Sequence, residues 1–466
     1  HQMNQMFRIL LFDFMVSNGF GAAISSTNND ILKMYCAKSF VKFELTNVVI
    51  SLVMVAVLVG MTIGSLITAS LTKKFKKTRI TQVCGLICLL SNAACCIPVH
   101  WTVLLLFRVC AGFGQAVIST IIPGWMTELV AAKTRPYMML LVQLFVTFAI
   151  FVNSLAMLLI NNDPSKFQLT FAWGMLCNIG TIGCTFLIKE QQQTQSHIAE
   201  MVEDVVQIRK RLSWKSKEMR KSLLNVIFLG VGSQATGINV VVLYAAGIFA
   251  SSLKMENASM YGNLIVGVVN CVPVVIPLLL LRCIGRKTFL MAGWFICCVG
   301  LAALMIIYGM NLQNADTLIL LSSVVFLFGF EIGPGPFVGV VLSEIFPKQF
   351  RSQLIGATYT IMWFTNVILI VTFPFLQQIV AVAYGIYMSI TLVTGVGLCF
   401  TLPETKGKSL EQIENEVTRV KSKAKQQVIQ LQPSKRLSLL EEPQLGESLG
   451  SNNIYGRHDS DILKGD

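Results

Sequence analysis

Apolar runs of about 20 residues recur from one end of this chain to the other. A run of that length crosses the hydrocarbon core of a bilayer as one helix. Of the 466 residues, 54% are hydrophobic and 13% are charged, and soluble globular proteins do not have that composition. We therefore expect a multi-pass membrane protein with the lipid bilayer as its surroundings.

About twelve spans are expected, which predicts an all-α membrane protein with twelve transmembrane helices in two six-helix halves. The spans are placed at 7–28, 45–70, 80–99, 102–128, 137–160, 169–188, 222–250, 260–281, 288–309, 316–345, 352–376 and 380–402.

The net charge of +13 is concentrated in alternate connections between the spans. The clusters are Lys73, Lys74, Lys76, Lys77 and Arg79; Lys133 and Arg135; Arg282, Arg286 and Lys287; and Lys348 and Arg351. Loops rich in Lys and Arg remain in the cytosol, so both termini are expected there. Because the charge does not follow one amphipathic face, the sequence argues against nucleic acid as a partner.

Composition divides the chain into four parts. An N-terminal six-helix bundle (1–188) and a C-terminal six-helix bundle (222–402) are joined by a polar cytosolic linker with short helices (189–221). The last part (403–466) is rich in Lys, Glu, Gln and Ser and is expected to be a largely disordered cytosolic tail.

The two halves repeat one motif. Glu128 and Arg135 are separated by the same interval as Glu344 and Arg351, and each pair follows an apolar span. Parallel six-span repeats with a binding site at their interface describe one major class of secondary transporter.

The tenth span holds an ionisable residue, Glu331, three positions before Pro334-Gly335-Pro336. Proline removes a backbone donor and clashes with the preceding turn, so a helix must kink or open there. Such a break is tolerated in a membrane only where it faces protein or a water-filled cavity. Two interpretations stay open: a carboxylate that lines a transport path, or a packed kink in which Glu331 is paired structurally.

Amide side chains inside other spans extend this hypothesis, because amides donate and accept hydrogen bonds and so suit a hydroxylated ligand. Helix-to-helix hydrogen bonding is the alternative role for each of them. Gln234 and Asn239 point about 140° apart on an ideal helix, so only unwinding at Gly237 brings both to one ligand. The candidate amides are Gln143, Gln234, Asn239, Asn270 and Asn366. Other polar or aromatic candidates inside the spans are Ser233, Thr236, Tyr244 and Trp363.

Enzyme and metal chemistry find no support. The four histidines lie at ends or in loops, and no P-loop is present, so ATP, a cofactor or a metal ion is not expected to take part. The cysteines, 13 in all, lack metal-ligand spacing and are interpreted as small buried residues. Asn257 opens a glycosylation sequon in a loop placed outside the cell.

Three motifs resemble the facilitative glucose transporter family, sugar porters of the major facilitator superfamily. They are SQATGIN at 233–239 with LYAAGIF at 243–249, FEIGPGP at 330–336, and LPETKGKSLEQI at 402–413. The similarity runs over about 410 residues, from the first span into the tail. It implies the major facilitator fold.

The resemblance also implies roles for residues. Sugar contacts carry over to Gln143, Gln234, Asn239, Asn270, Glu331 and Asn366, with Trp363 beside the site. Cytosolic gating contacts carry over to Arg108, Glu128, Arg135, Glu344 and Arg351, with Pro334, Gly335 and Pro336 in the gating helix. Proton-coupled relatives have an aspartate where this chain reads Gly19-Phe20-Gly21-Ala22, which argues against that coupling; Asp13 is interpreted as interfacial.

The chain departs from the family pattern in several places. Ser233 replaces the usual first glutamine, Leu243 a tyrosine, and Gly339 the large aromatic after GPGP, while Arg282 and Lys76-Lys77-Thr78 alter the cytosolic motifs. We expect a plasma-membrane uniporter for a monosaccharide such as glucose or fructose, working by alternating access. The alternatives are a uniporter for urate, dehydroascorbate or a polyol, and a sugar sensor that does not transport.

Overall fold

The computed structural model describes residues 2–26, 29–41, 44, 46–131, 133–160, 163–188, 217–242, 258–310, 312, 315–347 and 350–408. All of them belong to one compact unit, His1–Arg419. The described residues are helices and connections, without a strand, and they include twelve helical segments long and apolar enough to cross a membrane. The predicted fold class is confirmed.

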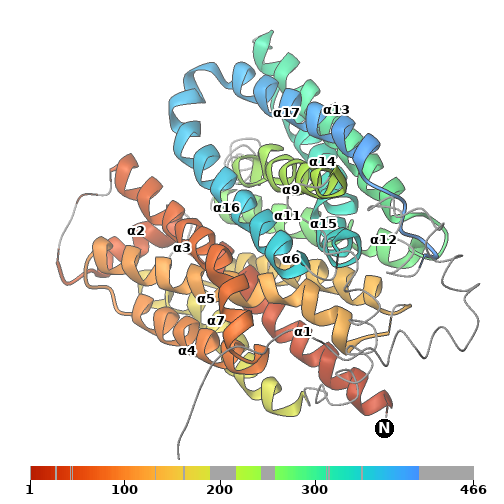
Figure 1. Cartoon of the computed structure of the whole chain (residues 1–466). Helices are drawn as coiled ribbons and strands as arrows, with labels where there is room; N and C mark the ends of the chain where they lie inside the picture. The colour runs from red at the N-terminus through yellow and green to blue at the C-terminus, as the bar shows by residue number, and fades with distance from the viewer. Residues whose placement is uncertain are drawn as a thin grey trace, which may run out of the picture. The chain divides into compact units, whose positions relative to one another are not determined.

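The first half contains six of the candidate spanning helices, which Figure 1 shows. These are α1 (Gln2–Ser25), α3 (Asn47–Lys74), α4 (Lys77–Cys95), α5 (Trp101–Leu129), α6 (Arg135–Ile160) and α7 (Leu169–Leu187), with the short α2 (Asn29–Lys38) and the 3-10 turn η1 (Pro164–Lys166) in connections.

The second half has the same number of spans, and three of them are interrupted. Its elements are α9 (Lys217–Ala235), α11 (Ala258–Cys271), α12 (Val275–Leu280), α13 (Arg286–Gly309), α14 (Asp316–Ile332), α15 (Pro334–Ile345), α16 (Arg351–Leu376), η3 (Gln377–Ile379) and α17 (Val380–Thr401).

Small residues let the helices approach closely. A Cβ atom at Gly112 of α5 would overlap the backbone carbonyl of Val57 on α3, so these helices meet backbone to backbone. The two halves contact each other where α3 packs along α16 and α6 along α11. These contacts leave the central face of each half directed toward the other.

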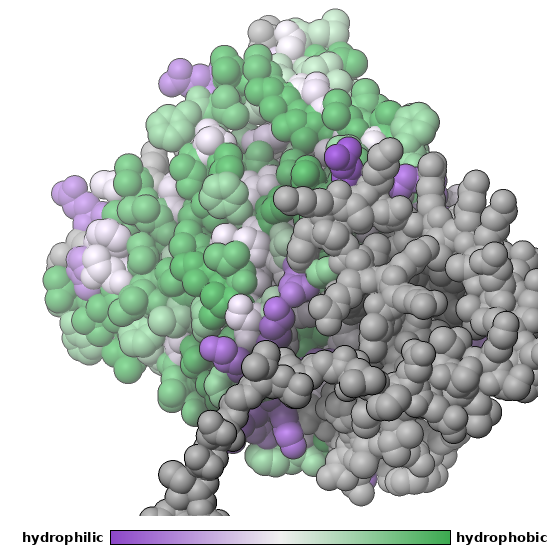
Figure 2. Space-filling model, viewed as in Figure 1, coloured by the Kyte–Doolittle hydropathy of each residue, from purple (hydrophilic) through white to green (hydrophobic). Residues whose placement is uncertain are grey.

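The outer surface is apolar. Figure 2 shows hydrophobic residues over most of the coloured part of the visible face. Leu66, Phe186 and Phe400 are 65%, 75% and 83% exposed, on three different spans. In water a surface of this kind would promote aggregation, whereas in a bilayer it faces lipid tails.

Three spans are interrupted. Gly333 separates α14 from α15 immediately before Pro334, where the sequence predicted a break. In the seventh span, α9 ends at Ala235, Gly237 has a φ of 76°, and helix resumes over 238–242. The third break, at 272–274 between α11 and α12, was not predicted, because 260–281 was interpreted as one continuous helix. Pro273 accounts for it, since it gives no backbone N–H to a helix.

Several predictions concern residues outside the described part. These are the linker up to 216, the tail from 409, Leu243, Tyr244 and the sequon at Asn257. Residues 217–221, which were assigned to the linker, already belong to α9. All 13 cysteines are described, and all are free thiols.

Candidate functional site

A cavity of about 730 Å³ lies between the two halves. Helices α1, α3, α5 and α6 line it from one side, and α9, α11, α14, α15 and α16 from the other. Its wall combines apolar side chains with hydroxyl and amide groups, and Lys33 and Glu331 are the charged residues among the described lining. Apolar walls with a few convergent polar groups are typical of small-molecule sites.

The cavity extends toward one end of the spans. Its wall includes Ser51 at the start of α3, Asn153 near the end of α6 and Phe373 near the end of α16, all at the end of the spans opposite the clusters of Lys and Arg. We call this the open end, and we call the opposite end, which carries the clusters of Lys and Arg, the basic end. The protein therefore has one accessible and one closed side.

A hydrogen bond between the halves crosses the cavity wall. Gln143 on α6 donates from Nε2 to Oε2 of Glu331 on α14, at 2.9 Å. Glu331 is only 3% exposed. Gly335, in the first turn of α15, allows both groups to lie close to its backbone, because a Cβ there would be 3.0 Å from Gln143 Nε2 and 3.1 Å from Glu331 Oε2.

The break at Gly237 brings together two amides that a regular helix would separate. Asn239 Nδ2 donates to Gln234 Oε1 at 3.3 Å, and both residues line the cavity. The helix is thus unwound at Gly237, as the sequence analysis required if Gln234 and Asn239 are to face the same site.

Of the remaining predicted contact residues, two line the cavity and one does not. Asn270 lines the cavity and donates its Nδ2 to the Val266 carbonyl at 2.8 Å. Trp363 lines it too, and its ring lies 5.6 Å from that of Phe20 on the other half. Asn366 is buried but does not belong to the lining, and its Nδ2 has no hydrogen-bond partner. The structure thus brings six of the seven predicted residues to one cavity.

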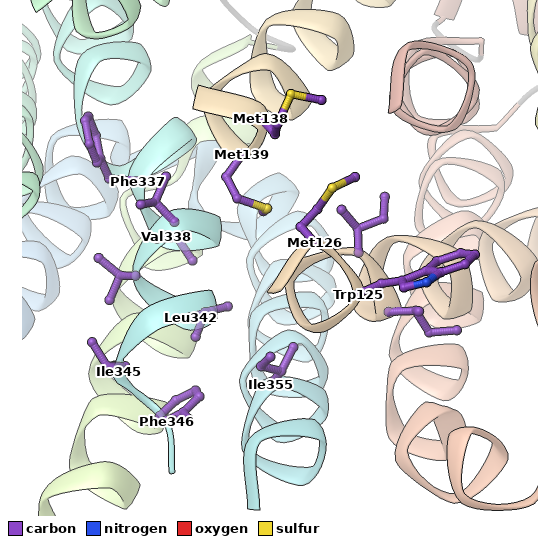
Figure 3. Close-up of a cluster of buried hydrophobic side chains, with 14 of the residues drawn as sticks. Trp125, Met126, Met138, Met139, Phe337, Val338, Leu342, Ile345, Phe346 and Ile355 are labelled. Atoms are coloured by element: carbon purple, nitrogen blue, oxygen red, sulfur yellow. The ribbon is translucent and has the colours of Figure 1, made fainter. Parts of the chain in front are cut away.

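Apolar side chains close the basic end. Figure 3 shows Met126, Met138 and Met139 on helices of the first half, beside the helices of the second half that carry Val338, Leu342 and Ile355. All six are buried, and they belong to one hydrophobic cluster. Full burial of one such side chain is favourable by about 1.5–3 kcal/mol relative to its exposure to water, so the part of this burial that forms between the halves stabilises the closed arrangement.

Charged residues repeat around this closure. Lys77 at the start of α4 forms an ion pair with Glu128 at the end of α5. In the second half Glu344 lies within electrostatic range of Arg286, which starts α13 in the same way. Each glutamate of the sequence repeat thus lies near the basic residue that starts a neighbouring helix, with an ion pair formed in the first half.

The two arginines of the repeat bind backbone carbonyls. Arg135 donates from Nη2 to Thr127 at 3.1 Å, and Arg351 from Nε to Phe346 at 3.2 Å. Each carbonyl belongs to the end of the preceding span, so each arginine fastens the connection between two consecutive spans. Arg135 also interacts electrostatically with Glu344 on the other half.

Two further contacts between the halves were not predicted. The hydroxyls of Thr72 on α3 and Ser352 on α16 lie 3.2 Å apart, and Arg282 donates from Nε to the Tyr137 hydroxyl at 3.3 Å. Single hydroxyl groups carry no pattern in a sequence, so only the packing of the helices identifies these pairs.

Arg108 lies elsewhere. It precedes Glu128 by 20 positions on the same helix, which is about 30 Å along its axis. The guanidinium is wholly buried near the open end and donates from Nη1 to the Ser26 hydroxyl at 2.7 Å. This placement corrects the expectation that Arg108 shares a charge cluster with Glu128 and Arg135.

Asp13 also differs from its interpretation as an interfacial residue. It is 0% exposed, and the Ser17 hydroxyl donates a hydrogen bond to its Oδ1 at 3.3 Å. Atom Oδ2 has no hydrogen-bond partner within the described part of the chain. Neighbouring helices α5, α6 and α7 cover this part of α1.

Comparison with known proteins agrees with this architecture. The proton:xylose symporter XylE from E. coli, bound to 6-bromo-6-deoxy-D-glucose, superposes with a TM-score of 0.75 at 19% identity, over 89% of this chain and 99% of that one. The probable metabolite transport protein CsbC of Bacillus subtilis (strain 168) is 23% identical over 406 residues, 79% of this chain and 86% of that protein. Human facilitated glucose transporter member 7 is 32% identical over 202 residues, 42% of this chain and 39% of that protein.

Twelve candidate spans in two halves around a central cavity form the fold that the major facilitator superfamily symporter XylE has. The sequence model of the sugar (and other) transporter family matches residues 8–417, so the chain belongs to that family. It is a divergent sugar porter and not an enzyme.

Proposed function

We propose that this protein is a uniporter that moves a monosaccharide such as glucose or fructose across a membrane by alternating access. The observation that carries the proposal is the cavity between the halves, where amide groups of both halves lie beside the buried Glu331. Gln143, Gln234, Asn239 and Asn270 supply donors and acceptors for sugar hydroxyls, and Trp363 supplies an apolar face.

Sugar binding would exchange hydrogen bonds rather than add them to an empty site. The contacts Gln143–Glu331 and Asn239–Gln234 satisfy these groups in the sugar-free structure. A sugar hydroxyl placed between either pair accepts from one group and donates to the other, so no buried polar atom loses its partner. Because the sugar is uncharged, Glu331 acts as a hydrogen-bond acceptor and not as a counter-charge.

Proton-coupled relatives carry an aspartate at one position of the first helix. The residue that this chain has at that position supports uniport over proton symport. That position is Gly21 here, and its Cα lies directly against the Val146 carbonyl of α6. No side chain fits between the two helices in this arrangement. A carboxylate of the kind used for proton coupling is therefore missing from that site.

In this proposal the basic end faces the cytosol, as the alternation of Lys and Arg in the connections favours. The structure would then be the outward-facing state. Opening the cytosolic side requires separation of the apolar cluster around Met126 and Leu342 and of the pair Thr72–Ser352. We place the protein in the plasma membrane, with both termini in the cytosol.

A polyol is the second candidate substrate. The major myo-inositol transporter IolT of Bacillus subtilis (strain 168) is 32% identical over 202 residues, 41% of this chain and 42% of that protein. A polyol presents the same hydroxyl groups to the same amides, so the cavity chemistry suits both classes.

Counterflow of labelled solutes into liposomes that contain the purified protein tests the proposal. We expect exchange of glucose or fructose, and weaker exchange in Gln234→Ala, because that variant loses an amide of the cavity wall. Exchange of a polyol without exchange of any monosaccharide would replace the sugar with the second candidate. Binding without exchange would indicate a sensor, and unchanged exchange in Gln234→Ala would remove the assigned site.

A further inference from the structure

Asp13 is a carboxylate inside the membrane to which the proposed transport cycle assigns no task. Its side chain is wholly buried, and among the described residues the Ser17 hydroxyl is its one hydrogen-bond donor. An ionised carboxylate without a counter-charge is costly to bury, and ionisable residues inside spans are rare and usually functional. The position therefore requires an explanation beyond packing.

Among the residues that the structure describes, no neighbouring side chain gives Asp13 a counter-charge. The described titratable residues of the helices packed against α1 are Arg108, Cys110 and Glu128 on α5, Arg135 and Tyr137 on α6, and Cys177 and Cys184 on α7. Arg108 binds Ser26, Glu128 pairs with Lys77, and Arg135 binds the Thr127 carbonyl. On α1 itself, Arg8 donates to the Leu187 carbonyl. Asp13 is thus surrounded by uncharged contacts in this conformation.

The place of Asp13 on α1 relates it to the transport path. Ser17, Phe20 and Ile24 line the cavity at steps of three and four residues, and Asp13 precedes Ser17 by four. Asp13 continues this stripe by one more turn toward the basic end, within about 40° of each of the three. Asp13 therefore lies on the face of α1 that lines the cavity, between the cavity and the basic end.

Three neighbours of Asp13 along α1 belong to the cluster that closes the basic end. Ile9, Phe12 and Val16 of α1 are part of the hydrophobic cluster that contains Met126 and Leu342, and the Phe12 ring packs edge-on against Trp125 at 5.2 Å. When the halves separate at the basic end, water that fills the space along the stripe reaches Asp13. A hydrated carboxyl group ionises far more readily than a buried one.

We propose that Asp13 is a proton-binding site that controls access from the basic end: it holds a proton while that end is closed and releases it to that side when the end opens. The inference rests on the proposed function, because it assumes alternating access. The proton returns to the side from which it came, so the device adjusts the rate of transport without driving accumulation. Acid on the basic side keeps that end closed.

The test is equilibrium exchange of labelled sugar in liposomes with the same pH on both sides. We expect the wild-type exchange rate to fall as the pH changes from neutral to acidic, by up to about tenfold per pH unit for one linked proton. Asp13→Asn keeps the shape and mimics the protonated group, so its exchange should be slow and independent of pH. Asp163→Asn removes an acid near the open end that is 40% exposed and should keep the wild-type profile.

A structural measurement keeps the inference testable whatever the transport rate. Spin labels at positions 72 and 352 report the separation of the halves at the basic end, where the two hydroxyls now lie 3.2 Å apart. We expect long distances to become rarer with acid in the protein that retains Asp13, and to be rare at every pH with Asp13→Asn. A pH response that persists in Asp13→Asn, or a wild-type protein without one, would overturn the role of Asp13. Absence of sugar exchange with a normal distance response would instead contradict the proposed function.

Discussion

Asn239 donates a hydrogen bond to Gln234 across the break that Gly237 makes in the seventh span. The two amides are five positions apart, and the contact exists because the φ of Gly237 is 76°. Only glycine adopts that conformation without strain. One backbone angle thus determines whether the second half presents two amides to the cavity or one.

Replacement of Gly237 should therefore damage both the fold and the site. In Gly237→Ala the new Cβ would lie 2.7 Å from Cδ2 of the Tyr387 ring, in addition to the strain of the positive φ. We expect a destabilisation of roughly 1–3 kcal/mol and a loss of sugar affinity. Thermal unfolding in detergent and ligand binding measure the two effects.

Gly183→Ala is the matched control. That glycine lies within α7, with no heavy atom within 4 Å of an added Cβ. Its replacement should leave stability and binding as they are, or raise stability slightly because alanine favours helix. Equal behaviour of the two variants would contradict the account of the break.

A disulfide across the closed basic end should arrest transport. The hydroxyls of Thr72 and Ser352 are 3.2 Å apart and belong to opposite halves. In the double variant Thr72→Cys, Ser352→Cys we expect oxidation to cross-link the halves, since disulfides need Cβ atoms about 3.5–4.5 Å apart. Exchange should stop on oxidation and return with a reductant.

The single variants Thr72→Cys and Ser352→Cys control for the native thiols, of which Cys283 and Cys399 are exposed. Neither single variant should respond to oxidation more than the wild type does. Transport that continues at full rate in the cross-linked protein would show that this end does not need to open.

Gly339 is expected to influence substrate choice. It lines the cavity, and a Cβ there would meet only Met139 Cε, at 3.0 Å. Gly339→Trp should fill this space and reduce exchange of fructose more than that of glucose, by a difference of roughly 1–3 kcal/mol. Competition between the two labelled sugars measures the ratio.

Gly339→Ala should change the ratio little, because the methionine side chain is flexible and yields to one methyl group. An unchanged ratio in a folded Gly339→Trp variant would mean that the sugar does not approach this part of the wall.

The breaks in the spans show what the sequence reveals and what it conceals. Pro334-Gly335-Pro336 beside Glu331 predicted the interruption between α14 and α15, because two prolines and a glycine cannot continue a regular helix. Pro273 did not lead us to predict the interruption between α11 and α12. Prolines inside membrane helices are often tolerated when neighbours satisfy the freed carbonyl, so a single proline leaves a kink and a break equally possible.

Burial was harder to predict than the helices. Asp13 was placed at an interface because it lies early in its span, but α5, α6 and α7 enclose it. Asn366 shares a helix face with Trp363 and Ile370, which line the cavity, yet it is not part of the wall. Both outcomes depend on how whole helices pack, and that information is not local in sequence.

The central claim is uniport, and the final distribution of sugar tests it most directly. Liposomes that contain the purified protein would be incubated with labelled sugar, with and without an imposed pH gradient, until uptake ends. We predict that the internal concentration equals the external one in both cases, because the gradient changes only the rate. Accumulation above the external concentration that needs the pH gradient and collapses with a protonophore would contradict uniport and identify a proton symporter.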